Sequence, residues 1–194
     1  MIYKSIDASE LDIDERELAV RLSSPNTRSV LNSVHYDKLL KASSPAYVAE
    51  RVSITVAQNG IFIGGIYTES KAIMKALKDS DECFIMVCTL GLGVDKLIAK
   101  EAFTSVYDAF VIDAMADAAI EAACDFAERD MCGGCEILPR FSPGYADLPL
   151  TIGCEIVRLL RADTHLGIRF TDSGMMIPGK SVSAIVGIKR PEKE

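Results

Sequence analysis

The residues best suited to bind a ligand lie between positions 140 and 183. This segment opens with Arg140-Phe-Ser-Pro143-Gly144-Tyr145 and closes with Ser181-Val-Ser183. A guanidinium pairs with carboxylates, and a phenol both donates and accepts hydrogen bonds. Proline fixes φ and glycine permits positive φ, so the pattern predicts stiff, turned loops. Binding groups usually lie on loops of this kind.

A row of carboxylates precedes this segment. Asp113, Asp117, Glu121 and Asp125 stand four residues apart, which places them along one stripe of a helix. Like charges at this spacing repel, and a solvated helix face is the simplest explanation. The alternative is that one or two of these carboxylates face a cleft and meet a cationic ligand.

Two further motifs have both a chemical and a structural explanation. Cys132-Gly-Gly-Cys135 is half of a four-cysteine zinc site or a redox pair, or else a flexible loop with incidental thiols. Gly91-Leu-Gly93 follows an expected strand and precedes an expected helix, an arrangement that can hold a phosphate. The third glycine of the dinucleotide fingerprint is absent, so a tight turn is the simpler interpretation.

The composition excludes several classes of function. The 194 residues are 49% apolar and 25% charged, as in an ordinary soluble globular protein. A net charge of −7 argues against nucleic-acid binding, which needs clustered Lys and Arg. No apolar run reaches the roughly 20 residues of a membrane span, and the N-terminus lacks a signal-peptide pattern. We therefore expect a cytoplasmic protein with reduced cysteines and no membrane partner.

The elements that must position these residues form a mixed α+β pattern. The hydrophobic periodicity predicts one domain over 1–194, with a helical lead-in over 1–45 and a core over 46–194 that holds the Arg140–Ser183 region. Helices are predicted over 15–22, 27–42, a short stretch after Ser70, 94–100, 104–130 and 151–160. Strands are predicted over 52–56, 61–67, 83–88 and 181–188. The tail 189–194 is expected to fray.

Several turns and caps are also predicted. Asp12 or Asp14 can cap the first helix, Thr68 or Ser70 the helix that follows, and Thr151 the helix after the motif loop. Gly64-Gly65 indicates a bulge or a close backbone approach. Gly167 is expected to end the helix that begins at Thr151.

Two motifs in the region then match a known family. Arg140-Phe-Ser-Pro-Gly144-Tyr145 is followed by Pro149, and Phe170-Thr-Asp-Ser-Gly-Met-Met176-Ile-Pro178-Gly-Lys-Ser181-Val-Ser183-Ala184 comes one helix later. Together they resemble the activation (reactivation) domain of cobalamin-dependent methionine synthase. Ala116-Asp117 and Glu121-Ala122 also resemble that family's Ala-Asp-x-x-x-Glu-Ala. The resemblance covers residues 105–185 most closely.

The resemblance implies a C-shaped α+β domain with a twisted antiparallel sheet flanked by long helices. It implies binding of S-adenosylmethionine and docking on cobalamin carried by a corrinoid protein or the methionine synthase core, with reduction by an electron-donor protein. Arg140 would hold the methionine carboxylate, Glu121 the amino group or sulfonium, and the Pro143-Gly144 backbone would approach the ligand. Tyr145, the catalytic candidate, would face the corrin. The cofactors would carry the chemistry.

The sequence also departs from the family. Ala146-Asp-Leu-Pro149 replaces its Pro-Ala-Cys-Pro, and the aromatic residues that follow its last strand have no counterpart. The leading hypothesis is a standalone reactivation module that supports reductive remethylation. One alternative is a non-catalytic cap or chaperone for a corrinoid protein that does not use S-adenosylmethionine. The other is a metal or redox protein built on Cys132 and Cys135.

Overall fold

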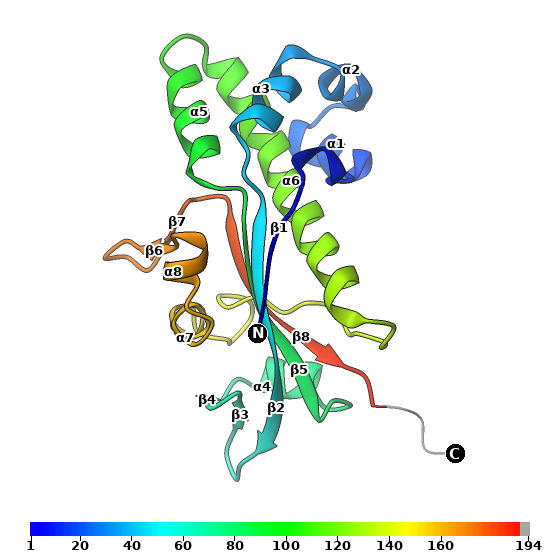
Figure 1. Ribbon diagram of the computed structural model, residues 1–194, viewed down its shortest axis with the longest axis vertical. Coiled ribbons are helices and arrows are strands. Elements are labelled where there is room, and N and C mark those ends of the chain that lie inside the picture. The colour runs from blue at the N-terminus through cyan, green and yellow to red at the C-terminus, as the bar shows by residue number, and fades with distance from the viewer. Residues whose placement is uncertain (191–194) are drawn as a thin grey trace.

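The computed structural model describes residues 1–190; the predicted fraying of 191–194 lies outside the described residues. Three long antiparallel strands form the centre of one twisted sheet (Figure 1): β2 (Ala46–Val56), β5 (Glu82–Thr89) and β8 (Ser181–Ile188). The other edge of β2 pairs with β1 (Ile2–Ser5) at one end and with β3 (Ile61–Ile63) at the other, and β4 (Ile66–Thr68) follows β3.

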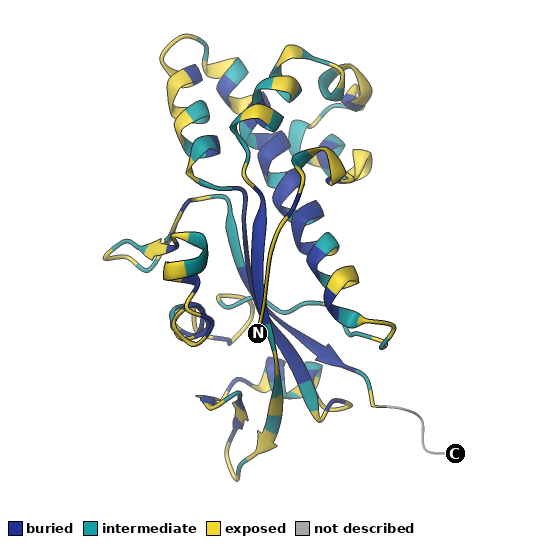
Figure 2. Cartoon of the chain, viewed as in Figure 1, coloured by how far each residue is buried: buried dark blue, intermediate teal, exposed yellow. Residues whose placement is uncertain are grey.

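Alternation along β5 divides the core into two halves. Phe84, Met86 and Cys88 pack on one face of the sheet, whereas Cys83, Ile85 and Val87 pack on the other. Both sets are buried, which explains why the strand appears in the sequence as a continuous apolar run. In Figure 2, β5 and β8 are largely dark blue on both sides of the crossing point, whereas the second half of β2 is teal and yellow.

Helix α6 (Val106–Cys132) covers the first face of the sheet (Figure 1). Its buried side is mainly alanine, which is a strong helix former and leaves room for close packing. Four more helices contact α6 or one another on this side: α1 (Glu15–Leu22), α2 (Thr27–Leu31), α3 (Val34–Ala42) and α5 (Leu92–Ala102). A short 3-10 helix, Ala8–Glu10, precedes α1.

The second face carries shorter elements. Helix α4 (Lys71–Ala76) lies near the β3–β4 hairpin, and α7 (Thr151–Leu159) packs on β5 and β8. Helix α8 (Ala162–Leu166) contacts β2, and a small hairpin, β6 (Arg169–Phe170) with β7 (Met176–Ile177), follows it. The prediction of an α+β protein with an antiparallel sheet between helices is confirmed. None of the described helices is long and apolar enough to cross a membrane.

Several predicted elements are confirmed with close boundaries. Helix α1 spans Glu15–Leu22, and Asp14 caps it by accepting the Arg16 N–H at 2.7 Å. The Ser70 hydroxyl accepts the Ile73 N–H at 3.2 Å and caps α4. The final strand occupies 181–188, as predicted. These elements depend on local patterns and local hydrogen bonds.

Other predictions for the helices are wrong. The helix expected over 27–42 is interrupted at Ser33, whose backbone is extended, so it forms α2 and α3. The lead-in over 1–45 is not wholly helical, because β1 pairs with β2. Thr151 is the first residue of α7 rather than its cap; α7 matches the predicted range 151–160 to within one residue, but the chain breaks at Arg161, before Gly167. Gly167 does end the second piece, α8.

The glycines explain two further differences. Gly64 and Gly65 have φ of +57° and +94° and form the two-residue turn between β3 and β4, so the predicted single strand 61–67 is a hairpin and not a bulged strand. A Cβ on Gly93 would lie 2.2 Å from the Ala42 carbonyl oxygen. Close packing of α5 on the end of α3 therefore accounts for this glycine without a phosphate.

Candidate functional site

The chain positions Arg140 by adding a short stretch to the free edge of β8. Ile137 bridges Ile188 and Phe141 bridges Ile185, both antiparallel. The Phe141 N–H donates to the Ile185 carbonyl at 2.8 Å, and the return bond is 2.9 Å. Phe141 packs with the core of the second face. Because neighbouring residues of an extended chain point to opposite faces, Arg140 points towards α6.

The loop that follows is a compact turn. The Tyr145 N–H donates to the Ser142 carbonyl at 3.2 Å, and the Gly144 N–H donates to the Leu148 carbonyl at 2.8 Å. Gly144 has φ of +91°, a conformation that glycine adopts without strain. Leu148 is buried and anchors the turn, whereas Tyr145 remains 73% exposed. The turn thus presents the Tyr145 ring to solvent on a rigid support.

Asp147 fastens this turn to the N-terminal end of α4 on the same face of the sheet. Its carboxylate accepts hydrogen bonds from the Ser70 hydroxyl at 2.5 Å and from the Lys71 and Ala72 amides at 2.8 and 3.1 Å. The Ser70 hydroxyl and these amides hold the pKa of Asp147 below its usual value. Sequence reasoning noted Asp147 only as a departure from the family motif, because its partners lie more than 70 residues away.

Arg140 lies within a cluster of three carboxylates from one face of α6. Its Nη2 donates to Glu121 at 2.6 Å, and its Nη1 donates to Asp125 at 2.7 Å and to Glu128 at 2.6 Å. The Arg140 side chain is 21% exposed, and that of Glu128 is 16% exposed. We call these four residues the Arg140 cluster. Glu128 extends the acidic stripe by a further turn that the sequence analysis did not include.

The cluster leaves part of the guanidinium available. Burial lowers the pKa of Arg140, but the hydrogen bonds that it donates to Glu128, Asp125 and Glu121 outweigh burial and hold the pKa above its usual value. A guanidinium has five N–H donors, and hydrogen bonds within the described residues use three of them. Two donors therefore remain, enough for one additional carboxylate.

The upper half of the acidic stripe is also paired. The Lys180 ammonium lies 2.8 Å from Asp113 and 2.5 Å from Asp117, and Arg21 lies 3.4 Å from Asp117. The four carboxylates predicted along the stripe keep between 31% and 53% of their side-chain exposure, as a solvated face would, and they also face cations that the protein itself supplies. These cations offset the repulsion between carboxylates spaced four residues apart.

A cavity of about 260 Å³ opens beside the Arg140 cluster. It brings together Glu121 from α6 and Arg140 and Tyr145 from the loop; the rest of its lining is Phe141, Ser142 and Val182. Pro143 and Gly144 do not line it. Pro143 instead faces α7, where a Cβ on Gly153 would meet it at 3.7 Å.

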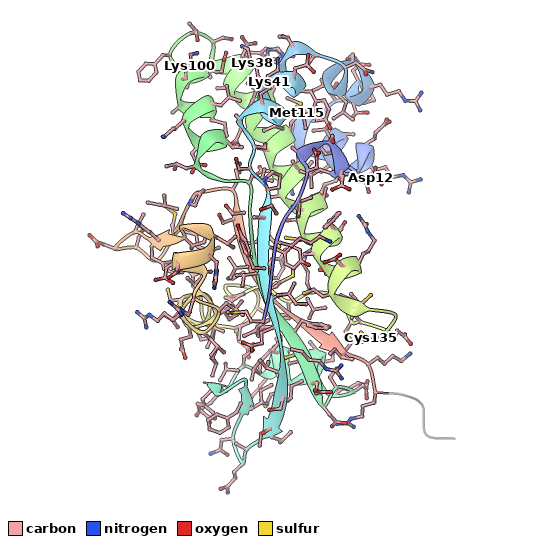
Figure 3. All side chains as sticks on the ribbon, in the orientation of Figure 1. Asp12, Lys38, Lys41, Lys100, Met115 and Cys135 are labelled. Atoms are coloured by element: carbon pink, nitrogen blue, oxygen red, sulfur yellow. The ribbon has the colours of Figure 1, made fainter. Side chains whose placement is uncertain are left out.

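The cysteine pair lies apart from this cavity. Cys132 is the last residue of α6, and Figure 3 shows Cys135 just beyond that end of the helix. Residues 1–190 contain no group of three or more Cys, His, Asp or Glu side chains placed to hold a metal ion. Reactive thiolates are favoured at helix N-termini, and this is the opposite end. The geometry gives the metal or redox alternative no support.

Comparison with known proteins identifies a neighbour among solved structures. No protein-family model matches the chain, and no curated protein matches it. The crystal structure of the MetH reactivation domain bound to AdoHcy superposes with a TM-score of 0.71 at 19% identity, over 100% of this chain and 80% of that one. At this identity the likeness establishes the fold and not the ligand. The chain thus has the fold of the MetH reactivation domain.

Proposed function

We propose that the chain binds S-adenosylmethionine in the cavity beside Arg140 and supports the reductive remethylation of cobalamin carried by another protein. The observation that carries the proposal is the meeting of Glu121, Arg140 and Tyr145 at one cavity. The crystallised MetH domain, which shares this fold, is bound to AdoHcy, the demethylated product of the same donor.

The amino-acid end of the ligand suits the pair at the cavity wall. Its carboxylate would take the two remaining N–H donors of Arg140, while its ammonium would meet the Glu121 carboxylate. Asp125 and Glu128 would keep Nη1 in place, because both hold it from outside the cavity. The site is thereby organised before the ligand arrives, which lowers the cost of ordering it.

The exposed surface around Tyr145 suits a large flat partner group. Leu150 is 52% exposed and Met175 63% exposed. The Leu150 side chain approaches both Gly144 and Gly174, so it links the Tyr145 turn to the β6–β7 hairpin. Exposed apolar groups that gather in this way mark interaction surfaces. We assign this surface to the corrin ring of a partner protein.

In this role the chain supplies binding and orientation. S-adenosylmethionine supplies the methyl group, and an electron-donor protein supplies the electron. Arg140 and Glu121 would fix the amino-acid end, and the Tyr145 hydroxyl would point from the exposed turn towards the cobalt. The surrounding protein surface would exclude water when the corrinoid protein docks.

Calorimetry with a charge-conserving variant tests the ligand. Arg140→Lys keeps a cation among the three carboxylates but loses the planar fork, so S-adenosylmethionine should bind at least tenfold more weakly. Lys180→Arg is the matched control, since it changes the other paired cation of the stripe and should leave affinity unchanged. Absence of binding by the unaltered protein at millimolar ligand would refute the proposal.

A spectroscopic assay tests the reaction. The protein is mixed with a cob(II)alamin-loaded corrinoid protein and a reductant, and S-adenosylmethionine is added last. We expect methylcobalamin to form with the unaltered protein and much more slowly with Arg140→Lys. Equal rates with and without the protein would contradict the remethylation role.

One observation favours the second candidate, a cap that uses no S-adenosylmethionine. Arg140 already contacts three carboxylates, so the positive charge of its guanidinium is compensated without a ligand carboxylate. Two results together would support the cap. The Arg140→Lys variant would still retain a corrinoid protein, and the unaltered protein would show no calorimetric binding of S-adenosylmethionine.

A further inference from the structure

The Arg140 cluster carries more negative charge than its one cation offsets. Glu121, Asp125 and Glu128 contribute three negative charges and Arg140 one positive charge, a net charge of −2. Among residues 1–190, no second cation lies within 4 Å of these carboxylates. Arg21 is near enough to be influenced by Glu121, but it pairs with Glu17 and Asp117.

The three carboxylates occupy different places relative to the cavity. Glu121 lines it, whereas Asp125 and Glu128 lie behind the guanidinium and bind only Nη1. These two residues therefore do not touch a ligand in the cavity. Their charges still act there, because Coulomb interactions extend over about 8 Å at physiological ionic strength. Glu128 is largely buried, which reduces screening by solvent.

The ligand and its product differ in charge more than in shape. S-adenosylmethionine carries a sulfonium, an ammonium and a carboxylate, a net charge of +1. S-adenosylhomocysteine lacks the methyl group and the sulfonium charge and is neutral overall. A site whose charge is −2 attracts the first more strongly than the second. A site with balanced charge would discriminate between them only by the methyl group, which contributes little.

We propose that Asp125 and Glu128 are selectivity residues that make this site prefer the charged methyl donor over its neutral product. The inference rests on the proposed function and goes beyond it, because it assigns a role to two residues outside the cavity. Loss of the sulfonium charge would weaken the attraction as soon as the methyl group has left. The excess charge would thus favour exchange of product for a new donor molecule.

The test is the ratio of two affinities measured by calorimetry. S-adenosylmethionine and S-adenosylhomocysteine are titrated into the unaltered protein, Glu128→Gln and Asp125→Asn. Each variant keeps an oxygen that can accept from Nη1 and removes one charge. We expect the preference for S-adenosylmethionine to fall about two- to tenfold in each variant, mainly through weaker donor binding. Asp79→Asn, which removes an exposed charge in the turn before β5, is the control and should preserve the ratio.

Salt provides an independent measurement. The preference for S-adenosylmethionine should decrease between 0.05 and about 0.5 M salt in the unaltered protein and change less in Glu128→Gln. Equal weakening of both ligands in the variants would mean that Asp125 and Glu128 only hold Arg140, and it would overturn the inference while leaving the proposed function intact. Absence of binding by either ligand in the unaltered protein would refute both.

Discussion

The two halves of the acidic stripe on α6 use the same pattern for different purposes. In the upper half, Lys180 joins Asp113 and Asp117; in the lower half, Arg140 joins Glu121, Asp125 and Glu128. Lys180 leads directly into β8, and its carbonyl accepts the Leu90 N–H at 2.9 Å, so its end of the stripe joins helix to sheet. Arg140 instead borders a cavity.

Under the proposed function, one helix supports structure at one end of the stripe and ligand binding at the other. An ammonium is a point charge that two carboxylates can satisfy, whereas a guanidinium keeps donors available after three contacts. Lys180 has one N–H donor left, whereas Arg140 has two, so only the second arrangement can hold a ligand carboxylate by two hydrogen bonds. We therefore expect substitutions in the upper half to change stability alone and those in the lower half to change both stability and binding.

The largest effect is expected from Arg140→Ala. It leaves three neighbouring carboxylates without their cation, so the free energy of unfolding at neutral pH should fall by about 3 kcal/mol. Urea unfolding measures the change, and calorimetry should show that S-adenosylmethionine binding is lost. A change below about 0.5 kcal/mol would contradict the account of the cluster, since that is typical of surface substitutions.

Lys180→Met should lower the free energy of unfolding by less, about 1 kcal/mol at pH 8, and should leave the affinity for S-adenosylmethionine unchanged. Burial lowers the pKa of Lys180, but its bonds to Asp113 and Asp117 raise it above the usual 10.5. A raised pKa in the folded state contributes stability that is present below about pH 10.5 and is lost as the pH rises through the folded pKa. The difference in unfolding free energy between the unaltered protein and the variant should therefore shrink as the pH rises above 10.5. If Lys180→Met lost ligand binding, the expectation that the upper half of the stripe affects stability alone would be contradicted.

Asp147→Asn should weaken S-adenosylmethionine binding by about threefold, because Asp147 fastens the Tyr145 turn to α4. Its pKa is lowered in the folded state, so its contribution is present above about pH 3.8 and is lost as the pH falls through the folded pKa. Hydrogen exchange of the turn amides should accelerate in the variant. Unchanged hydrogen exchange and unchanged affinity would show that the turn is stable without the contact between Asp147 and α4.

The smallest effect is expected from replacing Cys132 and Cys135 with serine. Both thiols are partly exposed and lie outside the cavity lining, so affinity should stay within about twofold. Calorimetry on the double variant checks this. A tenfold loss of affinity would contradict the assignment of the site to the cavity beside Arg140 and would place it near the C-terminal end of α6.

Local patterns were sufficient to predict much of the fold. The alternation in 181–188 and the apolar run in 83–88 lie on β8 and β5, because both segments are buried by the layers around them. In contrast, β1 pairs with a strand more than 40 residues away, and all four of its residues are exposed. It therefore carries no hydrophobic pattern that could have identified it. The break at Ser33 was similarly hidden, since apolar spacing continues across it.

The sequence named three of the residues that line the cavity, but it did not predict the pairing of Arg140 or the part played by Glu128. The motif pointed to Arg140 and Tyr145, and the four-residue spacing of carboxylates included Glu121. That spacing is the same beside Lys180 and beside Arg140, so it does not indicate which carboxylates face a cavity. The pairing depends on where β8 and its edge segment 137–141 pass α6, which only the folded chain determines.

A crystal structure with S-adenosylhomocysteine tests the central claim most directly. We predict that the amino-acid carboxylate will lie within hydrogen-bonding distance of the Arg140 guanidinium and the ammonium beside Glu121, with Asp125 and Glu128 still bound to Nη1. A ligand seated elsewhere on the protein, or a cavity that stays empty at millimolar ligand while all three carboxylates remain bound to Arg140, would contradict it.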